Sequence, residues 1–105
     1  MEIVQYNIRI TNEALTDLRQ IAHHVREGSP QNAPLVAAMI LDAVHSLDRM
    51  PHRFRRAGQT RKRGSAVHAM VVAPFIVYYR IDEAQKAVRI LAVVHGARRQ
   101  PRRFD

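Results

Sequence analysis

Apolar residues gather in two runs towards the C-terminal end of the chain, and these runs predict the centre of a β-sheet. They cover residues 75–81 and 88–94 and are joined by a short polar turn with acidic and amide side chains. β-Branched and aromatic residues dominate both runs, as is typical of strands. Neither run alternates cleanly between apolar and polar positions, which indicates strands covered on both faces or lying centrally under helices. We therefore predict a hairpin in the middle of the sheet.

The N-terminal segment shows a different pattern, the two-residue period of a strand with one buried face. This strand is predicted over residues 2–10. Its inward positions are Val4, Tyr6, Ile8 and Ile10.

Two stretches with apolar residues three and four positions apart follow, and each predicts a helix. The first begins at a cap supplied by Thr11 or Asn12 and runs to about Glu27, where Gly28 fits the stop. Because few residues separate the two stretches, we expect an antiparallel helical hairpin.

The second helix has two candidate starts. Ser29 is a good cap and is followed by a proline, which suits a first turn. A start there would place Pro34 where it removes a helical hydrogen bond, which favours Asn32 as the cap. The apolar face continues to about Arg49, and Pro51 then ends the helix.

The remaining segments complete an α+β fold. Residues 52–64 are basic and predict an exposed loop, the least ordered internal stretch, and residues 65–73 predict a strand that meets the next one at Ala73-Pro74. The order predicts an N-terminal strand, a helical hairpin and a three-stranded antiparallel meander, with an antiparallel sheet buried on one face by the helices. We expect one domain over 1–105, with 96–105 as a basic C-terminal tail.

Composition narrows the class of protein. The chain has 105 residues, of which 47% are hydrophobic, enough for a single core. It has no cysteine, which excludes disulfides and thiolate metal sites. No apolar run has the length of a membrane span and the N-terminus has no secretion signal, so we expect a cytoplasmic protein.

Positive charge is large and clustered. The net charge is +8, and fifteen of the seventeen basic residues are arginine. No acidic residue occurs between Arg49 and Ile81, and a second cluster follows the last strand. This second cluster consists of Arg98, Arg99, Arg102 and Arg103. Such clustering favours an anionic partner over general solubility.

Histidines are the candidate catalytic or metal-binding groups. His23 and His24 are adjacent, so on a helix they point about 100° apart and cannot share a metal face. His68 and His95 lie at or near strands whose ends could converge, where a histidine could act as general acid or base in RNA cleavage beside arginines. His95 could equally order the turn before Gly96. We predict no metal site, no catalytic residue and no cofactor.

One charge stands within the apolar runs. Arg80 follows Tyr79, and a charge in such a run is costly unless it is paired or reaches a surface, so we assign it a surface or groove role. The aromatic residues Phe75, Tyr78 and Tyr79 could stack on bases. At strand spacing they are more often core residues.

Taken together, these residues resemble the ParE branch of the RelE/ParE toxin superfamily, and the match covers nearly the whole chain. The residues that carry the resemblance are Ala14-x-x-Asp17-Leu18-x-x-Ile21, Leu47-x-x-x-Pro51, Tyr79-Arg80 and Val94-His95-Gly96-Ala97-Arg98. The family's fold, a small sheet with an N-terminal helical hairpin, agrees with the order of elements above.

The resemblance implies a growth-inhibiting toxin of a type II toxin-antitoxin module, neutralised by an acidic ParD-like antitoxin in a hetero-oligomer. ParE-like members act on DNA gyrase, whereas RelE-like members cut mRNA on the ribosome with basic residues and usually a tyrosine near the C-terminus. Here the tail carries Phe104 and no tyrosine, and Ile76 stands where RelE-like strands often place an arginine. His68 stands where many relatives carry an arginine.

These departures favour a gyrase inhibitor over a ribosome-dependent endonuclease, and a harmless binding module is the third reading. For target binding we single out Arg80, His95, Arg98 and Arg99, because strand-borne cations are held rigidly. For antitoxin binding we single out Leu15 and Leu18 on the first helix and Arg61 and Arg63 in the loop.

Overall fold

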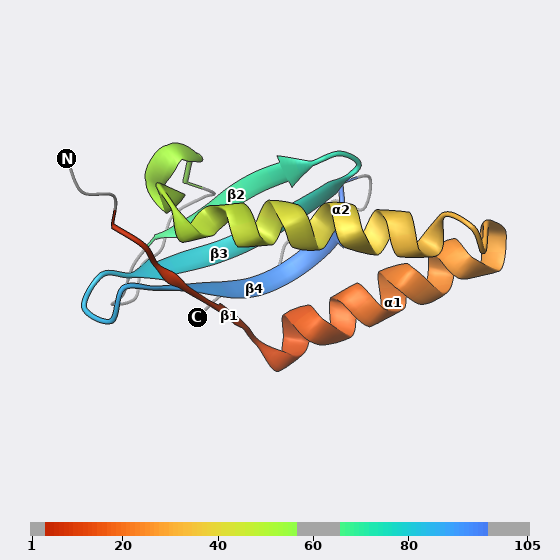
Figure 1. The fold of residues 1–105 in the computed structure, drawn as a ribbon, viewed down its shortest axis with the longest axis horizontal. Coiled ribbons are helices and arrows are strands. Elements are labelled where there is room, and N and C mark those ends of the chain that lie inside the picture. The colour runs from red at the N-terminus through yellow and green to blue at the C-terminus, as the bar shows by residue number, and fades with distance from the viewer. Residues whose placement is uncertain (1–3, 57–65, 97–105) are drawn as a thin grey trace.

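The computed structural model describes residues 4–56 and 66–96, which form a four-stranded sheet with two helices on one side (Figure 1). The helices are α1 (Asn12–Gly28) and α2 (Ala33–His45), followed by two 3-10 turns, η1 (Ser46–Asp48) and η2 (Pro51–Arg53). The strands are β1 (Asn7–Ile10), β2 (Val67–Val72), β3 (Phe75–Asp82) and β4 (Ala87–His95). The sheet order is β1-β4-β3-β2, so the predicted α+β fold and the central position of the β3–β4 hairpin are confirmed.

The sheet is mixed, which corrects the expectation of an antiparallel one. The β2–β3–β4 meander is antiparallel, but β1 pairs with β4 in parallel. Connectivity explains this result. The helical hairpin returns the chain to the end of the sheet where β1 begins, so β2 runs in the direction of β1, and two reversals later β4 does so again.

Both helices begin at a predicted cap, and the boundary that differs from the prediction is the end of α2. Thr11 caps α1 through its hydroxyl, which accepts a bond from the Ala14 amide at 3.2 Å, and Asn32 rather than Ser29 precedes α2. α2 ends at His45, earlier than predicted, because the chain tightens into η1. Arg53 then donates from Nη1 to the Arg49 carbonyl at 2.7 Å, which closes this corner.

β1 is shorter than its sequence pattern predicted. Regular pairing begins at Asn7, and Val4, expected on the buried side, is 51% exposed. Tyr6 is buried, and Ile8 and Ile10 pack against the core as expected.

One face of the sheet forms the core with the helices. Along β3 the side chains alternate strictly, with Phe75, Val77, Tyr79 and Ile81 buried against the helical layer. The opposite side, here called the far face, carries Ile76, Tyr78 and Arg80, which are half-buried. The prediction that Phe75 and Tyr79 are core residues is therefore confirmed.

β4 fails to alternate because it contains a bulge. Its register with β3 shifts between Tyr78 and Tyr79, which places Ile90 opposite Tyr79 and Ala92 opposite Tyr78, with Leu91 as the extra residue. The extra residue reverses which alternate positions of β4 face the core. Val88 and Ile90 before the bulge, and Val93 after it, therefore all reach the core.

Side chains of α1 and its cap hold this bulge. β1 ends at Ile10, opposite Ile90, so the backbone of β4 beyond that point has no strand beside it on that edge. The Thr11 hydroxyl donates to the Ile90 carbonyl at 2.8 Å, and the Asp17 carboxylate accepts from the Val93 amide at 2.9 Å. The helix thus satisfies backbone groups that the sheet leaves unpaired.

We predict that Asp17→Ala lowers the free energy of unfolding by about 1–3 kcal/mol, because it leaves the Val93 amide in a partly buried place without its acceptor. Urea unfolding followed by circular dichroism measures the change. Asp42→Ala, which removes an exposed carboxylate from α2, is the matched control and should change stability much less. Equal effects of the two substitutions would contradict the role assigned to Asp17.

Candidate functional site

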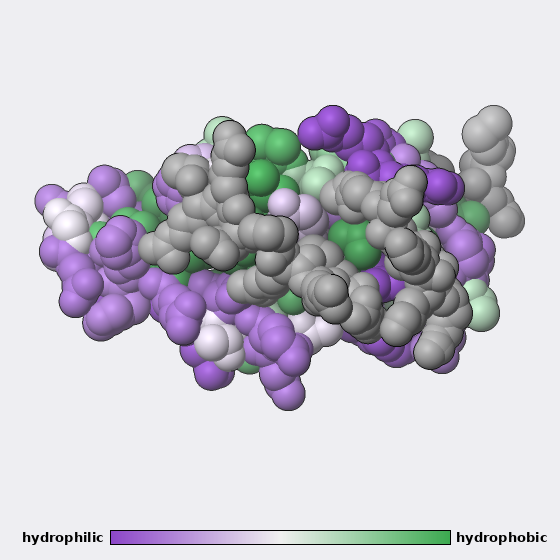
Figure 2. Space-filling view, turned by 180° about the vertical axis from the view of Figure 1, so that it is seen from behind, coloured by the Kyte–Doolittle hydropathy of each residue, from purple (hydrophilic) through white to green (hydrophobic). Residues whose placement is uncertain are grey.

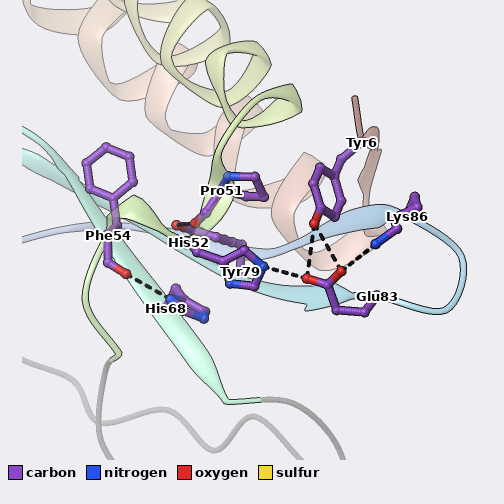
Figure 3. Close-up of polar contacts among 8 residues, drawn as sticks. All are labelled: Tyr6, Pro51, His52, Phe54, His68, Tyr79, Glu83 and Lys86. Atoms are coloured by element: carbon purple, nitrogen blue, oxygen red, sulfur yellow. Dashed lines mark hydrogen bonds and ion pairs between the residues drawn. The ribbon is translucent and has the colours of Figure 1, made fainter. Parts of the chain in front are cut away.

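A polar cluster joins three parts of the chain at one end of the sheet (Figure 3). The Glu83 carboxylate accepts from the Tyr6 hydroxyl at 3.0 Å and from Lys86 Nζ at 2.8 Å, and it meets His52 Nε2 at 2.5 Å. Lys86, then His52, hold the pKa of Glu83 at about 2, well below its usual range. This cluster, which we call the Glu83 clasp, ties the segment before β1 and η2 to the β3–β4 turn.

Beside the clasp, two aromatic groups are fixed in the core. The His68 ring stacks on Tyr79 with centroids 5.3 Å apart, and its Nδ1 donates to the Phe54 carbonyl at 2.9 Å. The Tyr79 hydroxyl donates to the Pro51 carbonyl at 2.6 Å, and burial raises the pKa of Tyr79 to about 12. Both groups have structural partners, and Tyr79 keeps its proton at neutral pH.

The structure does not bring the two candidate catalytic histidines together. His68 lies opposite Tyr79 and His95 lies opposite Phe75, which is four residues earlier on β3, so about 13 Å along the strand separates the two positions. His68 is buried, whereas His95 is exposed at the end of β4 with its ring edge against Phe75. The suggested convergence of these strand ends is wrong, because the structure keeps His68 and His95 apart.

The two predicted target-binding residues that the structure describes also lie apart. Arg80 is half-buried on the far face near the end of β3, opposite Arg89. His95 lies at the other end of the hairpin, on the side of Phe75. Arg98 and Arg99 lie outside the described residues.

Of the predicted antitoxin-binding residues, the structure describes the two on α1 and not the two in the loop. Leu15 is exposed on α1, whereas Leu18 is half-buried and packs against the core. Arg61 and Arg63 lie outside the described residues, as does most of the predicted basic loop.

The structure adds an apolar surface that the sequence analysis missed. Leu35 is 66% exposed and Met39 is 40% exposed, and because they are four residues apart they share the outward side of α2. Ile40 and Val44 of the same helix are fully buried on its inward side. The sequence of α2 could have predicted this surface, because the helix is apolar almost all round. A helix with one covered face needs only one apolar stripe.

No group of His, Cys, Asp or Glu side chains within residues 4–56 and 66–96 has the arrangement of a metal site. In the part of the chain that the structure describes, no helix combines the length and apolar character that crossing a bilayer would take.

Solved structures of toxin-antitoxin complexes share this architecture. The chain superposes on the chromosomal ParDE toxin-antitoxin system of P. aeruginosa with a TM-score of 0.70 and 20% identity, over 87% of this chain and 96% of that one. The match to the RelBE2 toxin-antitoxin complex of Mycobacterium tuberculosis has a TM-score of 0.62 and 26% identity, and it covers 88% of this chain and 99% of that one. The match to the archaeal RelE-RelB complex of Pyrococcus horikoshii OT3 has a TM-score of 0.62 and 15% identity, and it covers 90% of this chain and 98% of that one. The chain has the RelE/ParE fold.

The family model is more specific than the fold. The model described as ParE toxin of the type II toxin-antitoxin system, parDE, matches residues 8–100. The chain belongs to this ParE toxin family, which confirms the resemblance drawn from the sequence. A search among curated proteins found no match.

We predict that Glu83→Gln lowers stability near pH 6 by at most about 1 kcal/mol, since the carboxylate is half exposed and such pairs are screened. The pKa of Glu83 is about 2 in the folded protein and near 4.5 without its partners, so its contribution is present above pH 4.5 and is lost as the pH falls towards 2. The gap between the wild type and the variant should therefore narrow from pH 6 to pH 2.5.

Urea unfolding at several pH values tests this dependence, with Asp42→Asn as the control for loss of an exposed carboxylate. A gap that stays constant across the range would show that the Glu83 clasp does not contribute through ionisation.

Proposed function

We propose that this chain is a growth-inhibiting toxin that acts in the cytoplasm on DNA gyrase and is neutralised by a ParD-like antitoxin. The observation that carries the proposal is the match to the ParE toxin family over residues 8–100. The likeness to both ParDE and RelBE complexes supports a partner antitoxin, although it does not separate the two kinds of target.

The arrangement of the histidines supports binding rather than cleavage. General acid–base catalysis needs a group within hydrogen-bond reach of the proton that it moves. His68 is buried and engaged with Phe54 and Tyr79, and His95 is separated from it along the hairpin. We therefore keep ribosome-dependent mRNA cleavage as the alternative to gyrase inhibition.

The outward side of α2 supports a hydrophobic contact with the antitoxin. Leu35 and Met39 have the i, i+4 spacing at which a helix presents anchors to a partner. Because the chain has a net charge of +8, an acidic antitoxin would associate with it faster at low salt, whereas the apolar anchors would contribute most of the affinity.

Induced expression without antitoxin should stop growth with filamentation, DNA double-strand breaks and intact mRNA. Arg80→Ala should relieve most of this arrest because it removes a cation held on the rigid sheet, whereas Arg19→Ala, on the exposed side of α1, should leave it. DNA integrity and ribosome-bound mRNA are measured in the same cells. Cleaved mRNA with intact DNA would select the endonuclease instead.

The double variant Leu35→Asp and Met39→Asp should remain folded and toxic but escape neutralisation, with antitoxin affinity at least tenfold weaker, because both anchors are replaced by charges that an acidic partner repels. Titration calorimetry measures the affinity, and co-expression measures the rescue. His24→Asp, an exposed site on α1, is the control. If the antitoxin fully restored growth to cells that express the double variant, the outward side of α2 would not be part of the antitoxin-binding surface.

A further inference from the structure

Methionine is the one sulfur-containing residue type of this chain, which has four methionines and no cysteine. The structure describes three of them, and their surroundings differ. Met70 is 2% exposed and belongs to the core, whereas Met39 on α2 is 40% exposed and Met50, between η1 and η2, is 68% exposed. An oxidant that reacts with sulfur therefore reaches Met39 and Met50 in the folded protein more readily than Met70.

Met39 belongs to a continuous apolar area on the outward side of α2. Leu35, four residues earlier, is 66% exposed, and Ala38 is also exposed. Asp42 is the one carboxylate of this helix, which has no lysine or arginine. On the side of the molecule away from the helices, by contrast, much of the described surface is hydrophilic (Figure 2). A partner that buries apolar surface on α2 would therefore cover Met39.

Met50 is exposed in a different setting. It has a left-handed backbone conformation, with a φ of 52°, at the corner between two 3-10 turns, and Arg53 donates from Nη1 to its carbonyl at 3.2 Å. This corner lies beyond the end of α2. Oxidation of Met50 would add a polar atom to a side chain that already faces solvent. Met50 is therefore an internal control for Met39.

Peroxide oxidises a methionine in a two-electron step. The Sδ atom attacks one peroxide oxygen, the O–O bond breaks as the S–O bond forms, and the second oxygen leaves with both hydrogens as water. The product is a sulfoxide, which replaces a flexible apolar side chain by a polar one. Burying such a group against an apolar partner without a hydrogen bond is unfavourable. A sulfoxide reductase reverses the change.

We propose that Met39 is an oxidation site through which peroxide weakens the binding of the antitoxin to this chain. Of the three described methionines, Met39 alone is both accessible to solvent and part of the apolar side of α2. The inference rests on the proposed function, in which the antitoxin covers this side, and adds a redox input to it. The two events oppose each other by linkage: the antitoxin protects Met39 from peroxide, and the sulfoxide weakens the antitoxin.

Peptide mass spectrometry of the full-length chain in hydrogen peroxide tests the protection. In the free chain Met39 and Met50 should be oxidised well before Met70, because Met70 lies in the core. In the complex with the purified ParD antitoxin of the same module, Met39 should react at least about fivefold more slowly, and its slowing should exceed that of Met50. A Met39 rate that the antitoxin leaves unchanged would overturn the proposal.

Titration calorimetry tests the effect on affinity, with the peroxide removed by catalase before the antitoxin is added. Conversion of Met39 to the sulfoxide should weaken antitoxin binding about tenfold. Met50→Leu should show the same loss. The affinity of Met39→Leu, whatever its starting value, should be the same before and after peroxide. Met39→Gln, with a polar side chain, should bind more weakly than Met39→Leu without any peroxide.

Circular dichroism and an unmodified Met70 show that each sample has kept its fold. If the untreated, folded chain does not bind the antitoxin, the proposed function fails and this inference fails with it. If the untreated chain binds and the chain with Met39 sulfoxide binds equally well, this inference alone is overturned. The same holds if Met39→Leu loses as much affinity in peroxide as the wild type does.

Discussion

The register of the β3–β4 pair is the constraint on which the rest of this structure depends. In a sheet with one face buried, a slip of one residue would exchange every core side chain with its outward neighbour. The bulge at Leu91 lets β4 bury Ile90 and Val93 while keeping Arg89 on the far face. Asp17 fixes this irregular stretch from α1, so the helical hairpin secures the sheet as well as covering it.

Three features of the molecule lie at different places in the fold. The core face and the Glu83 clasp hold the fold, and His68 and Tyr79 bond to the backbone carbonyls of Phe54 and Pro51. The outward side of α2 offers apolar anchors, and the far face offers aligned cations. The proposed function needs two such surfaces, one for the antitoxin and one for the target. This separation is why substitutions on one surface can be tested without disturbing the other.

Sequence periodicity predicted the element order because helices and strands here follow their local patterns closely. It failed where one side chain decides the geometry over a long separation. The irregular pattern of β4 indicated cover on both faces or a central position under helices, and the position is central, but the pattern also reflects a bulge held by Asp17, 76 residues away. The alignment of Arg9 with Arg89 depends on the parallel pairing of β1, which no local pattern encodes. The place of Arg80 at the surface of the sheet could be predicted because a charge within an apolar run is itself a local signal.

The two-sidedness of β4 can be measured directly because the chain has no cysteine of its own. Single cysteines are introduced at Arg89 and at Ile90, and their reaction with a thiol reagent is followed in the folded protein. The register described here predicts rapid modification of Arg89→Cys and slow modification of Ile90→Cys that becomes rapid only on unfolding, since Arg89 is exposed and Ile90 is 0% exposed. Protection of Arg89→Cys together with rapid labelling of Ile90→Cys would contradict the assignment of the two faces.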